Sequence, residues 1–253
     1  MDAQVLNVLC DPETHEPLEL QPDALVNARS GKRYSIRDGI PDFLDTISGQ
    51  NKKYQELYDR IAAFYDLSSK LYCWLKGQRD FRRVYIDELE VSPGANILEV
   101  SVGTGANLPY FPSNVAFFGL DISWGMLRRC RKNLKKWNRT AELFHGEAER
   151  LPLREGLFDV VFHVGGINFF NDKAGAIQEM IRVAKSGTKL VIVDETEKIV
   201  KERYEKMPFL GRYYRKRAEA VTDPTTLVPG NMQEVNCKHI LDGKAYCLMF
   251  RKL

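Results

Sequence analysis

The stretch Ile97-Leu-Glu-Val-Ser-Val-Gly-Thr-Gly-Ala-Asn107 decides the fold of this chain. An apolar run is followed at once by two glycines, which is the pattern of a first strand turning into a first helix. Glycines at such a turn let the backbone approach a ligand closely, and open α/β sheets bind ligands at the carboxyl ends of their strands. The stretch therefore predicts an α/β domain that binds a ligand at this turn.

Short apolar runs alternate with helical segments on the carboxyl side of this stretch. Strands are expected at 97–100, 115–120, 158–162 and 189–193, and helices at 124–137 and 173–184. Residues 235–251 are expected to form two strands joined at Asp242-Gly243, an antiparallel hairpin that closes the sheet edge. The pattern predicts an α/β fold with a Rossmann-like, doubly wound sheet of seven strands, the last of them antiparallel.

The N-terminal part of the chain differs in character. Asp38-Gly39 is a hairpin signal and Pro41 ends any strand, so residues 1–48 are predicted to form a small β-rich module. The main domain is expected to occupy residues 49–253. It begins with helical segments at about 50–65, which have apolar positions three and four residues apart, and at about 74–89.

Composition bounds the class of protein. The chain has 253 residues, of which 44% are hydrophobic, and a formal net charge of +3, which indicates a globular protein and says little about partners. Its five cysteines are odd in number and include no CxxC pair, so neither a disulfide framework nor a four-thiolate zinc site is expected. No signal peptide and no bilayer-length apolar run is seen, and a soluble cytoplasmic protein is expected.

Several side chains around the glycine turn argue against a dinucleotide. Leu108 stands where a dinucleotide fingerprint requires its third glycine. The Glu99 carboxylate would repel a pyrophosphate, whereas it suits an ammonium group. Asp121 ends the next strand, where it can accept both hydroxyls of a ribose, and Glu147 is placed to accept from an adenine amino group.

Four segments in this order carry a family resemblance: Glu99-x-Ser-x-Gly103-x-Gly105, Gly119-Leu-Asp121-Ile-Ser123, Gly146-Glu147-Ala148-Glu149-x-Leu-Pro152 and Phe158-Asp159-Val160-Val161. Across about residues 54–195 the chain resembles the class I S-adenosylmethionine (SAM)-dependent methyltransferases, and within them the branch of ubiquinone/menaquinone biosynthesis and sterol-type enzymes. The resemblance implies SAM as cofactor and methyl transfer to a small-molecule or lipid/quinone-like acceptor. Two positions depart from the family, which usually has glycine at Ser101 and aspartate at Glu147.

The resemblance also implies roles for single residues. The first acid and the glycine loop would hold the methionine part of the cofactor, Asp121 the ribose, and Glu147 with Ala148 the adenine. The full set of expected cofactor contacts is Glu99, Ser101, Gly103, Gly105, Asp121, Ile122, Met126, Glu147, Ala148 and Tyr65. His163 ends the strand predicted at 158–162, where acceptors approach in this fold, and is the candidate catalytic residue. Against these roles, the glycines could simply form a tight turn, Asp121 could cap a helix in competition with Ser123, and a lone histidine is more often structural.

The N-terminal module carries a second resemblance. Leu9-Cys10-Asp-Pro12 and Tyr34-x-Ile-x-Asp-Gly39-Ile-Pro41 are similar to the zinc-ribbon-like domain of tRNA methyltransferase activator proteins. That family often carries two CxxC knuckles, and only Cys10 matches here, so no metal is expected. The activator-like module and the basic segments 128–136 and 198–217 leave an RNA methyltransferase as an alternative. The serine at position 101, where the family usually has glycine, leaves a non-enzymatic SAM-binding partner protein as a second alternative.

Overall fold

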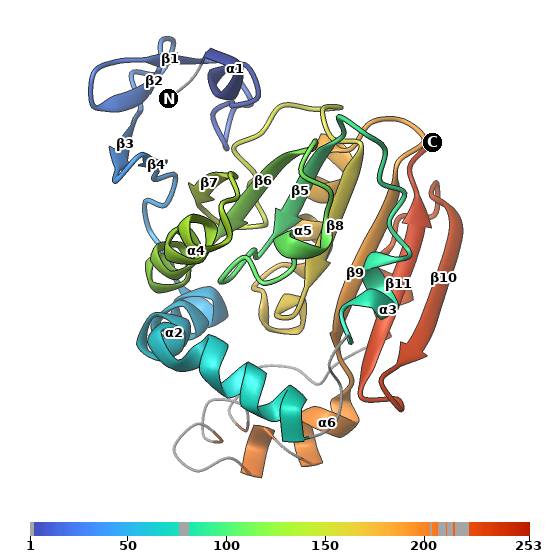
Figure 1. Ribbon diagram of the computed structural model, residues 1–253. Helices are drawn as coiled ribbons and strands as arrows, with labels where there is room; N and C mark the ends of the chain where they lie inside the picture. The colour runs from blue at the N-terminus through green and yellow to red at the C-terminus, as the bar shows by residue number, and fades with distance from the viewer. Residues whose placement is uncertain (1–2, 76–80, 203, 207–210, 212–214, 216–222) are drawn as a thin grey trace.

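The computed structural model describes residues 3–75, 81–202, 204–206, 211, 215 and 223–253 of the chain, and its centre is a seven-stranded sheet (Figure 1). The strand order is β10-β11-β9-β8-β5-β6-β7. Strands β5 to β9 pair in parallel, whereas β11 runs antiparallel to both β9 and β10. The predicted doubly wound, Rossmann-like sheet with its antiparallel last strand is confirmed. The strands are β5 Asn96–Val100, β6 Ala116–Asp121, β7 Glu142–His145, β8 Val160–Val164, β9 Lys189–Glu195, β10 Gln233–Ile240 and β11 Ala245–Arg251.

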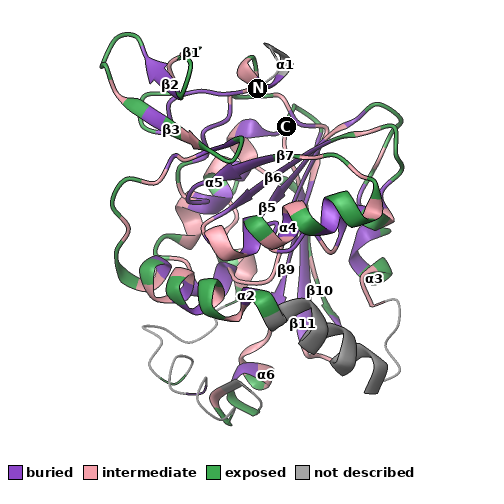
Figure 2. Ribbon diagram, turned by 60° about the vertical axis from the view of Figure 1, so that its left-hand side comes forward, coloured by how far each residue is buried: buried purple, intermediate pink, exposed green. Residues whose placement is uncertain are grey.

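The central strands are buried on both faces, as Figure 2 shows. This burial explains why they read as unbroken apolar runs rather than as alternating patterns. Strand β7 was not predicted, because four residues are too few to show a period. Strand β8 begins at Val160, two residues later than predicted, because Phe158 makes only an isolated bridge to Ala184.

Helices cover the sheet between its strands, and their ends follow local capping chemistry. Helix α4 spans Trp124–Trp137, as predicted, and the Ser123 hydroxyl accepts a hydrogen bond from the Met126 N–H at its start. Asp172 caps helix α5, Lys173–Val183, in the same way. The remaining short elements are α6 Glu197–Glu202 and the 3₁₀ turns η1 Leu108–Tyr110, η2 Ile167–Phe169, η3 Tyr204–Lys206 and η4 Pro224–Leu227.

The helix expected at about 74–89 is wrong. Helix α2 instead extends over Gly49–Leu75, residues 76–80 lie outside the described ranges, and α3 covers only Arg83–Ile86. Beyond α3, backbone N–H groups donate to the carbonyl three residues earlier, as Leu89 N–H does to the Ile86 carbonyl at 3.0 Å. Such bonds make tight turns, so the apolar side chains there pack without a continuous α-helix.

The N-terminal module is a four-stranded antiparallel sheet beside β7 (Figure 1). The predicted turn at Asp38 and Gly39 is confirmed, since both residues have positive φ, 53° and 76°. The polar centre of the module is Asp11, whose Oδ2 accepts bonds from Asn27 Nδ2 at 2.9 Å and from Tyr34 Oη at 3.0 Å. The elements are α1 Ala3–Leu6, β1 Leu18–Leu20, β2 Ala24–Asn27, β3 Arg33–Arg37 and β4 Ile40–Pro41.

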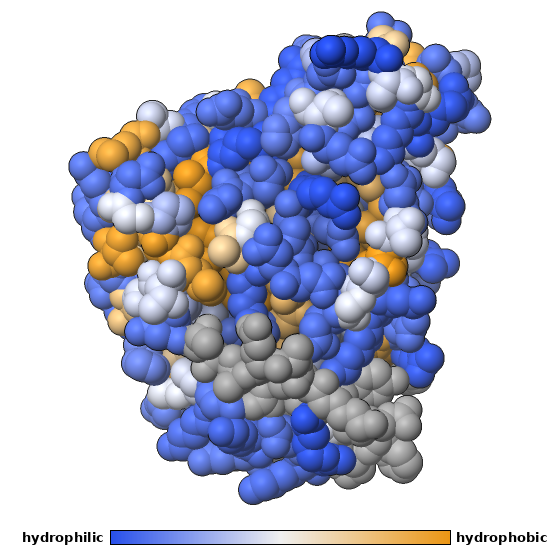
Figure 3. Space-filling model, turned by 180° about the vertical axis from the view of Figure 1, so that it is seen from behind, coloured by the Kyte–Doolittle hydropathy of each residue, from blue (hydrophilic) through white to orange (hydrophobic). Residues whose placement is uncertain are grey.

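The surface of the molecule is mainly hydrophilic on its rear face, where apolar side chains appear only in patches (Figure 3). Among the described helices, none combines the length and the apolar character needed to cross a membrane. Within the same part of the chain, no group of three or more His, Cys, Asp or Glu residues could hold a metal ion.

Candidate cofactor site

The predicted site residues gather at the carboxyl edge of the parallel strands. Glu99 lies at the end of β5, Asp121 is the last residue of β6, and Glu147 follows the end of β7. Since parallel neighbours end at the same edge, the three acids lie in sequence order along it. The glycine loop bridges the first two positions, because the Gly103 N–H donates to Asp121 Oδ2 at 2.7 Å.

Glu99 is buried, with 1% of its surface exposed, and only one of its oxygens is bonded. Oε1 accepts a hydrogen bond from Asn107 Nδ2 at 2.6 Å, whereas Oε2 has no hydrogen-bond partner among the described residues. Burial raises the pKa of Glu99 to about 8, although the Asn107 bond and the charge of Arg82 oppose the rise. A buried acceptor without a donor is costly, so this oxygen suits an incoming N–H group such as an ammonium.

The glycine loop has room for a ligand on one side only. A Cβ built on Gly103 would meet nothing within 4 Å, so its backbone borders open space. A Cβ on Gly105 would stand 2.7 Å from Cys130 Sγ, so helix α4 requires glycine at that position. Ser101, where the resembling family has glycine, adopts a left-handed backbone with φ of 61°. A serine costs about 1 kcal/mol in this conformation relative to glycine.

Replacing Ser101 by glycine is expected to stabilise the protein by about 1 kcal/mol, because glycine adopts this φ without strain. Urea unfolding measures the change. Ser123→Gly is the matched control: Ser123 has a negative φ, −102°, and its hydroxyl caps α4, so this variant should lose stability. A Ser101→Gly protein no more stable than the parent would show that the loop carries no such strain.

Asp121 holds the turn between β6 and α4. Its Oδ1 accepts the Ser123 N–H at 2.9 Å, while Ser123 itself caps the helix, as its position predicted. Burial raises the pKa of Asp121 to about 6, and the two backbone bonds oppose this rise. Each carboxylate oxygen retains a second lone pair, which a hydroxyl can use. Ile122 is partly buried and Met126 is buried in the same turn.

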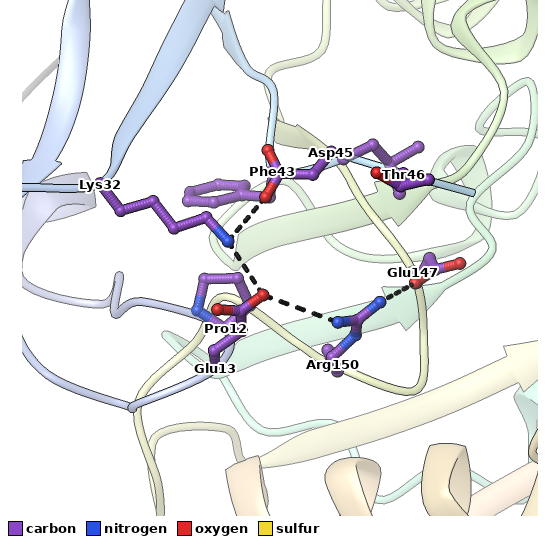
Figure 4. A pocket seen from close by; sticks show the side chains of 9 residues that line it. Pro12, Glu13, Lys32, Phe43, Asp45, Thr46, Glu147 and Arg150 are labelled. Carbon is purple, nitrogen blue, oxygen red and sulfur yellow. Dashed lines mark hydrogen bonds and ion pairs between the residues drawn. The ribbon is translucent and has the colours of Figure 1, made fainter. Parts of the chain in front are cut away.

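Glu147 is buried and is bonded from two sides. Its Oε1 accepts a bond from Asn51 Nδ2 at 3.1 Å, and its Oε2 accepts one from Arg150 Nη2 at 2.8 Å. Ala148, next to it, is 5% exposed. A cavity of about 210 Å³ lies between this position and the N-terminal module, and Lys32 and Glu13 line its far side (Figure 4).

Helix α2 crosses the same edge, and Tyr65 was its one residue among the predicted contacts. Its polar side chains Asn51, Gln55 and Asp59 are four residues apart and so share one face. Gln55 Nε2 donates to the Ile122 carbonyl at 3.0 Å, and Asp59 Oδ1 accepts from Ser123 Oγ at 2.6 Å. The spacing of these polar residues is visible in the sequence and could have identified them. The side chain of Tyr65, also predicted as a contact, lies outside the described part of the chain.

His163 occupies the expected end of β8, but its ring is fully engaged. Its Nδ1 lies 2.9 Å from the Val100 carbonyl oxygen, and its Nε2 accepts the Ile167 N–H at 3.0 Å. Burial lowers the pKa of His163 to about 4, so the ring is neutral with its proton on Nδ1. This arrangement leaves no nitrogen to take a proton from a substrate. It supports a structural role, joining β5, β8 and η2, instead of the catalytic role expected from its position.

Known sequences that are similar to this chain are methyltransferases. Residues 98–192 match the family described as methyltransferase domain. The demethylmenaquinone methyltransferase of Renibacterium salmoninarum is 32% identical over 139 residues, which are 54% of this chain and 56% of that protein. The ubiquinone/menaquinone biosynthesis C-methyltransferase of Hahella chejuensis is 27% identical over 216 residues, 80% of this chain and 86% of that protein. The chain spans little more than half the length of the first of these relatives.

Solved structures share the fold. A putative SAM-dependent methyltransferase from Methanococcus maripaludis aligns with a TM-score of 0.54 and 19% identity, covering 83% of this chain and 96% of that one. A chain from the complex of the Haloferax volcanii Trm112 methyltransferase activator with a putative methyltransferase aligns with a TM-score of 0.55 and 14% identity, covering 77% and 96%. With the acids Glu99, Asp121 and Glu147 in order along the sheet edge, this chain carries a methyltransferase domain over residues 98–192, and that domain is similar to enzymes of ubiquinone/menaquinone biosynthesis.

Proposed function

We propose that the protein transfers a methyl group from SAM to a quinone-like acceptor at the carboxyl edge of β5 and β6. The observation that carries this proposal is the Oε2 atom of Glu99, which is buried and has no partner among the described residues. The cofactor's methionine end carries an ammonium group, whose N–H donors would satisfy this oxygen. The open side of Gly103 gives the same end of the cofactor its room.

The other half of the cofactor would extend along the same edge. Asp121 would accept the ribose hydroxyls and Glu147 the adenine amino group, with Ile122, Met126 and Ala148 forming the apolar wall between them. When bound, SAM supplies a methyl group already activated by its sulfonium. The chain's own contribution is to align the reactants and to exclude water, and α2 supports both because its polar face is bonded to this edge.

The acceptor class is inferred from the relatives. The names of the Renibacterium and Hahella proteins state demethylmenaquinone and ubiquinone/menaquinone biosynthesis, which supports a quinone-like acceptor for this chain. We also propose that the protein acts in the cytoplasm. Among the described residues, Cys10, Cys237 and Cys247 are free thiols, as suits a reducing compartment.

The test is transfer of label from methyl-labelled SAM to a reduced naphthoquinone that lacks the ring methyl. Labelled methyl on a ring carbon of the product is expected, and the Asp121→Ala variant should give little product at the same SAM concentration. RNA and the unmethylated quinone are offered in parallel. Label in RNA with none in the quinone would favour the RNA methyltransferase, and SAM binding without transfer to either would favour the non-enzymatic partner protein.

A further inference from the structure

The N-terminal module is attached to the last residue of β7 and to the segment that follows it. The Phe43 N–H donates to the His145 carbonyl at 2.8 Å, and the Cys10 N–H donates to the Pro152 carbonyl at 3.0 Å. Leu9 and Phe43 of the module belong to the same hydrophobic core as Phe144 of β7. Because the core is continuous, the module is held rigidly against the part of the domain that carries Glu147.

His145 stands at the centre of this contact. It is 3% exposed, and it pairs in parallel register with Asp121. Its Nδ1 lies 2.7 Å from Asp42 Oδ1 of the module, and its Nε2 lies 2.9 Å from the Ile122 carbonyl oxygen. The Trp124 ring packs against the imidazole with 4.4 Å between the ring centroids.

Both polar partners of this ring are acceptors. A carbonyl accepts only, and Oδ2 of the Asp42 side chain also lies 3.5 Å from Arg37 Nε. The imidazole is therefore held between an oxygen of the module and an oxygen of the turn that follows β6. Burial raises the pKa of Asp121, and the nearby His145 is among the groups that lower it. An ionised Asp121 is the form that accepts two hydroxyl donors.

The Ile122 carbonyl is the point where this link meets the cofactor site. Ile122 is bonded in sequence to Asp121, and its carbonyl also accepts Gln55 Nε2 from α2 at 3.0 Å. A rotation of this peptide group would turn the Asp121 carboxylate, because the two share the chain between β6 and α4. His145 thus holds the Ile122 carbonyl from the side of the module, and Gln55 of α2 holds the same carbonyl from the other side.

We propose that His145 is a positioning residue for the adenosine half of the cofactor, which links Asp42 of the N-terminal module to the Ile122 carbonyl and so directs Asp121. This inference rests on the proposed function, since it assumes that SAM binds at Asp121. It gives the module a part in cofactor binding through a single side chain, 103 residues away from Asp42 in the sequence.

The test compares variants that retain different halves of the link. His145→Gln places an amide nitrogen near the former Nε2 and keeps the bond to Ile122, whereas His145→Asn places one near the former Nδ1 and keeps only the bond to Asp42. Calorimetric titration with S-adenosylhomocysteine is expected to show about tenfold weaker binding for His145→Asn and His145→Ala, and a smaller loss for His145→Gln. In turnover, KM for SAM should rise while KM for the acceptor stays unchanged.

The control is Arg154→Met, on another contact between module and domain. Arg154 Nε donates to the Leu9 carbonyl at 3.1 Å, and no hydrogen bond or ion pair among the described residues joins its side chain to the cofactor site. This variant should lower the thermal midpoint without changing cofactor affinity. If His145→Ala does not fold, the Asn and Gln pair, which keeps polar side chains of similar size, still decides the question.

Each outcome separates this proposal from the proposed function. Equal affinities of the Asn and Gln variants, or a loss of affinity in Arg154→Met as large as theirs, would overturn the positioning role while leaving SAM binding in place. Unchanged binding in Asp121→Ala would remove the cofactor assignment itself, and the role of His145 with it.

Discussion

Replacing Asp121 by alanine is expected to weaken SAM binding about a hundredfold. The carboxylate is the proposed acceptor of both ribose hydroxyls, and each hydrogen bond to a charged group contributes about 1.5–3 kcal/mol, so losing two of them costs a hundredfold or more in Kd. The loop bond from Gly103 to Asp121 is lost in the same variant, which loosens the methionine side as well. Calorimetric titration with SAM and S-adenosylhomocysteine measures both effects.

Asp159→Ala is the matched control for this experiment. Asp159 also accepts a backbone N–H, that of Asn96 at 2.9 Å, but it precedes β8, at the opposite edge of the sheet. Both variants should lose thermal stability, and only Asp121→Ala should lose affinity. Retained cofactor binding in Asp121→Ala would contradict the ribose assignment.

Glu99→Gln is expected to have the second large effect, about thirtyfold or more on cofactor affinity. The variant replaces the unpartnered carboxylate oxygen with a group that cannot offset an ammonium charge, and a charged hydrogen bond of this kind contributes about 2–3 kcal/mol. Glu88→Gln, at a partly exposed acid paired with Lys189 and Lys238, serves as control and should bind the cofactor normally. Unchanged affinity in Glu99→Gln would show that the ammonium group binds elsewhere.

Glu99→Gln should also change the number of protons released when the cofactor binds. Because burial raises the pKa of Glu99 from 4.5 to about 8, the free folded protein keeps a proton that the unfolded chain releases. Glu99 therefore contributes stability below about pH 4.5, and this contribution is lost as the pH rises through about 8. Cofactor binding favours the carboxylate, so binding at pH 7 should release a proton. Titration in buffers of different ionisation enthalpy should detect this release, and Glu99→Gln should abolish it.

The sequence was sufficient to predict those helices and strands whose caps and apolar periods are formed by their own residues. Helix α4 was predicted from Trp124 to Trp137 because its cap, Ser123, and its apolar period are both contiguous in sequence. Glu99 and Asp121 could be predicted because strand ends in a parallel sheet share one edge, so that position alone brings them together. The order of the four motifs then indicated SAM as the cofactor, through the resemblance to a known family.

Contacts between distant parts of the chain were beyond that method. Asn51 meets Glu147 across 96 residues, and no local pattern encodes this pairing. For His163 the position at the strand end was predicted correctly, but its bonds to Val100 and Ile167 depend on how β5 and η2 pack around it. Tertiary packing decides whether a side chain is free to act, and sequence position decides only where it stands.

The place of β11 in the sheet has a consequence for how the chain is made. This strand is the last of the seven to leave the ribosome, yet it lies between β9 and β10 and is almost wholly buried. At about 5–20 residues per second, the nascent chain carries β9 with an unpaired edge for several seconds. Such an edge is a template for pairing with other chains, so we expect the newborn protein to need shielding by a chaperone until residue 251 has emerged.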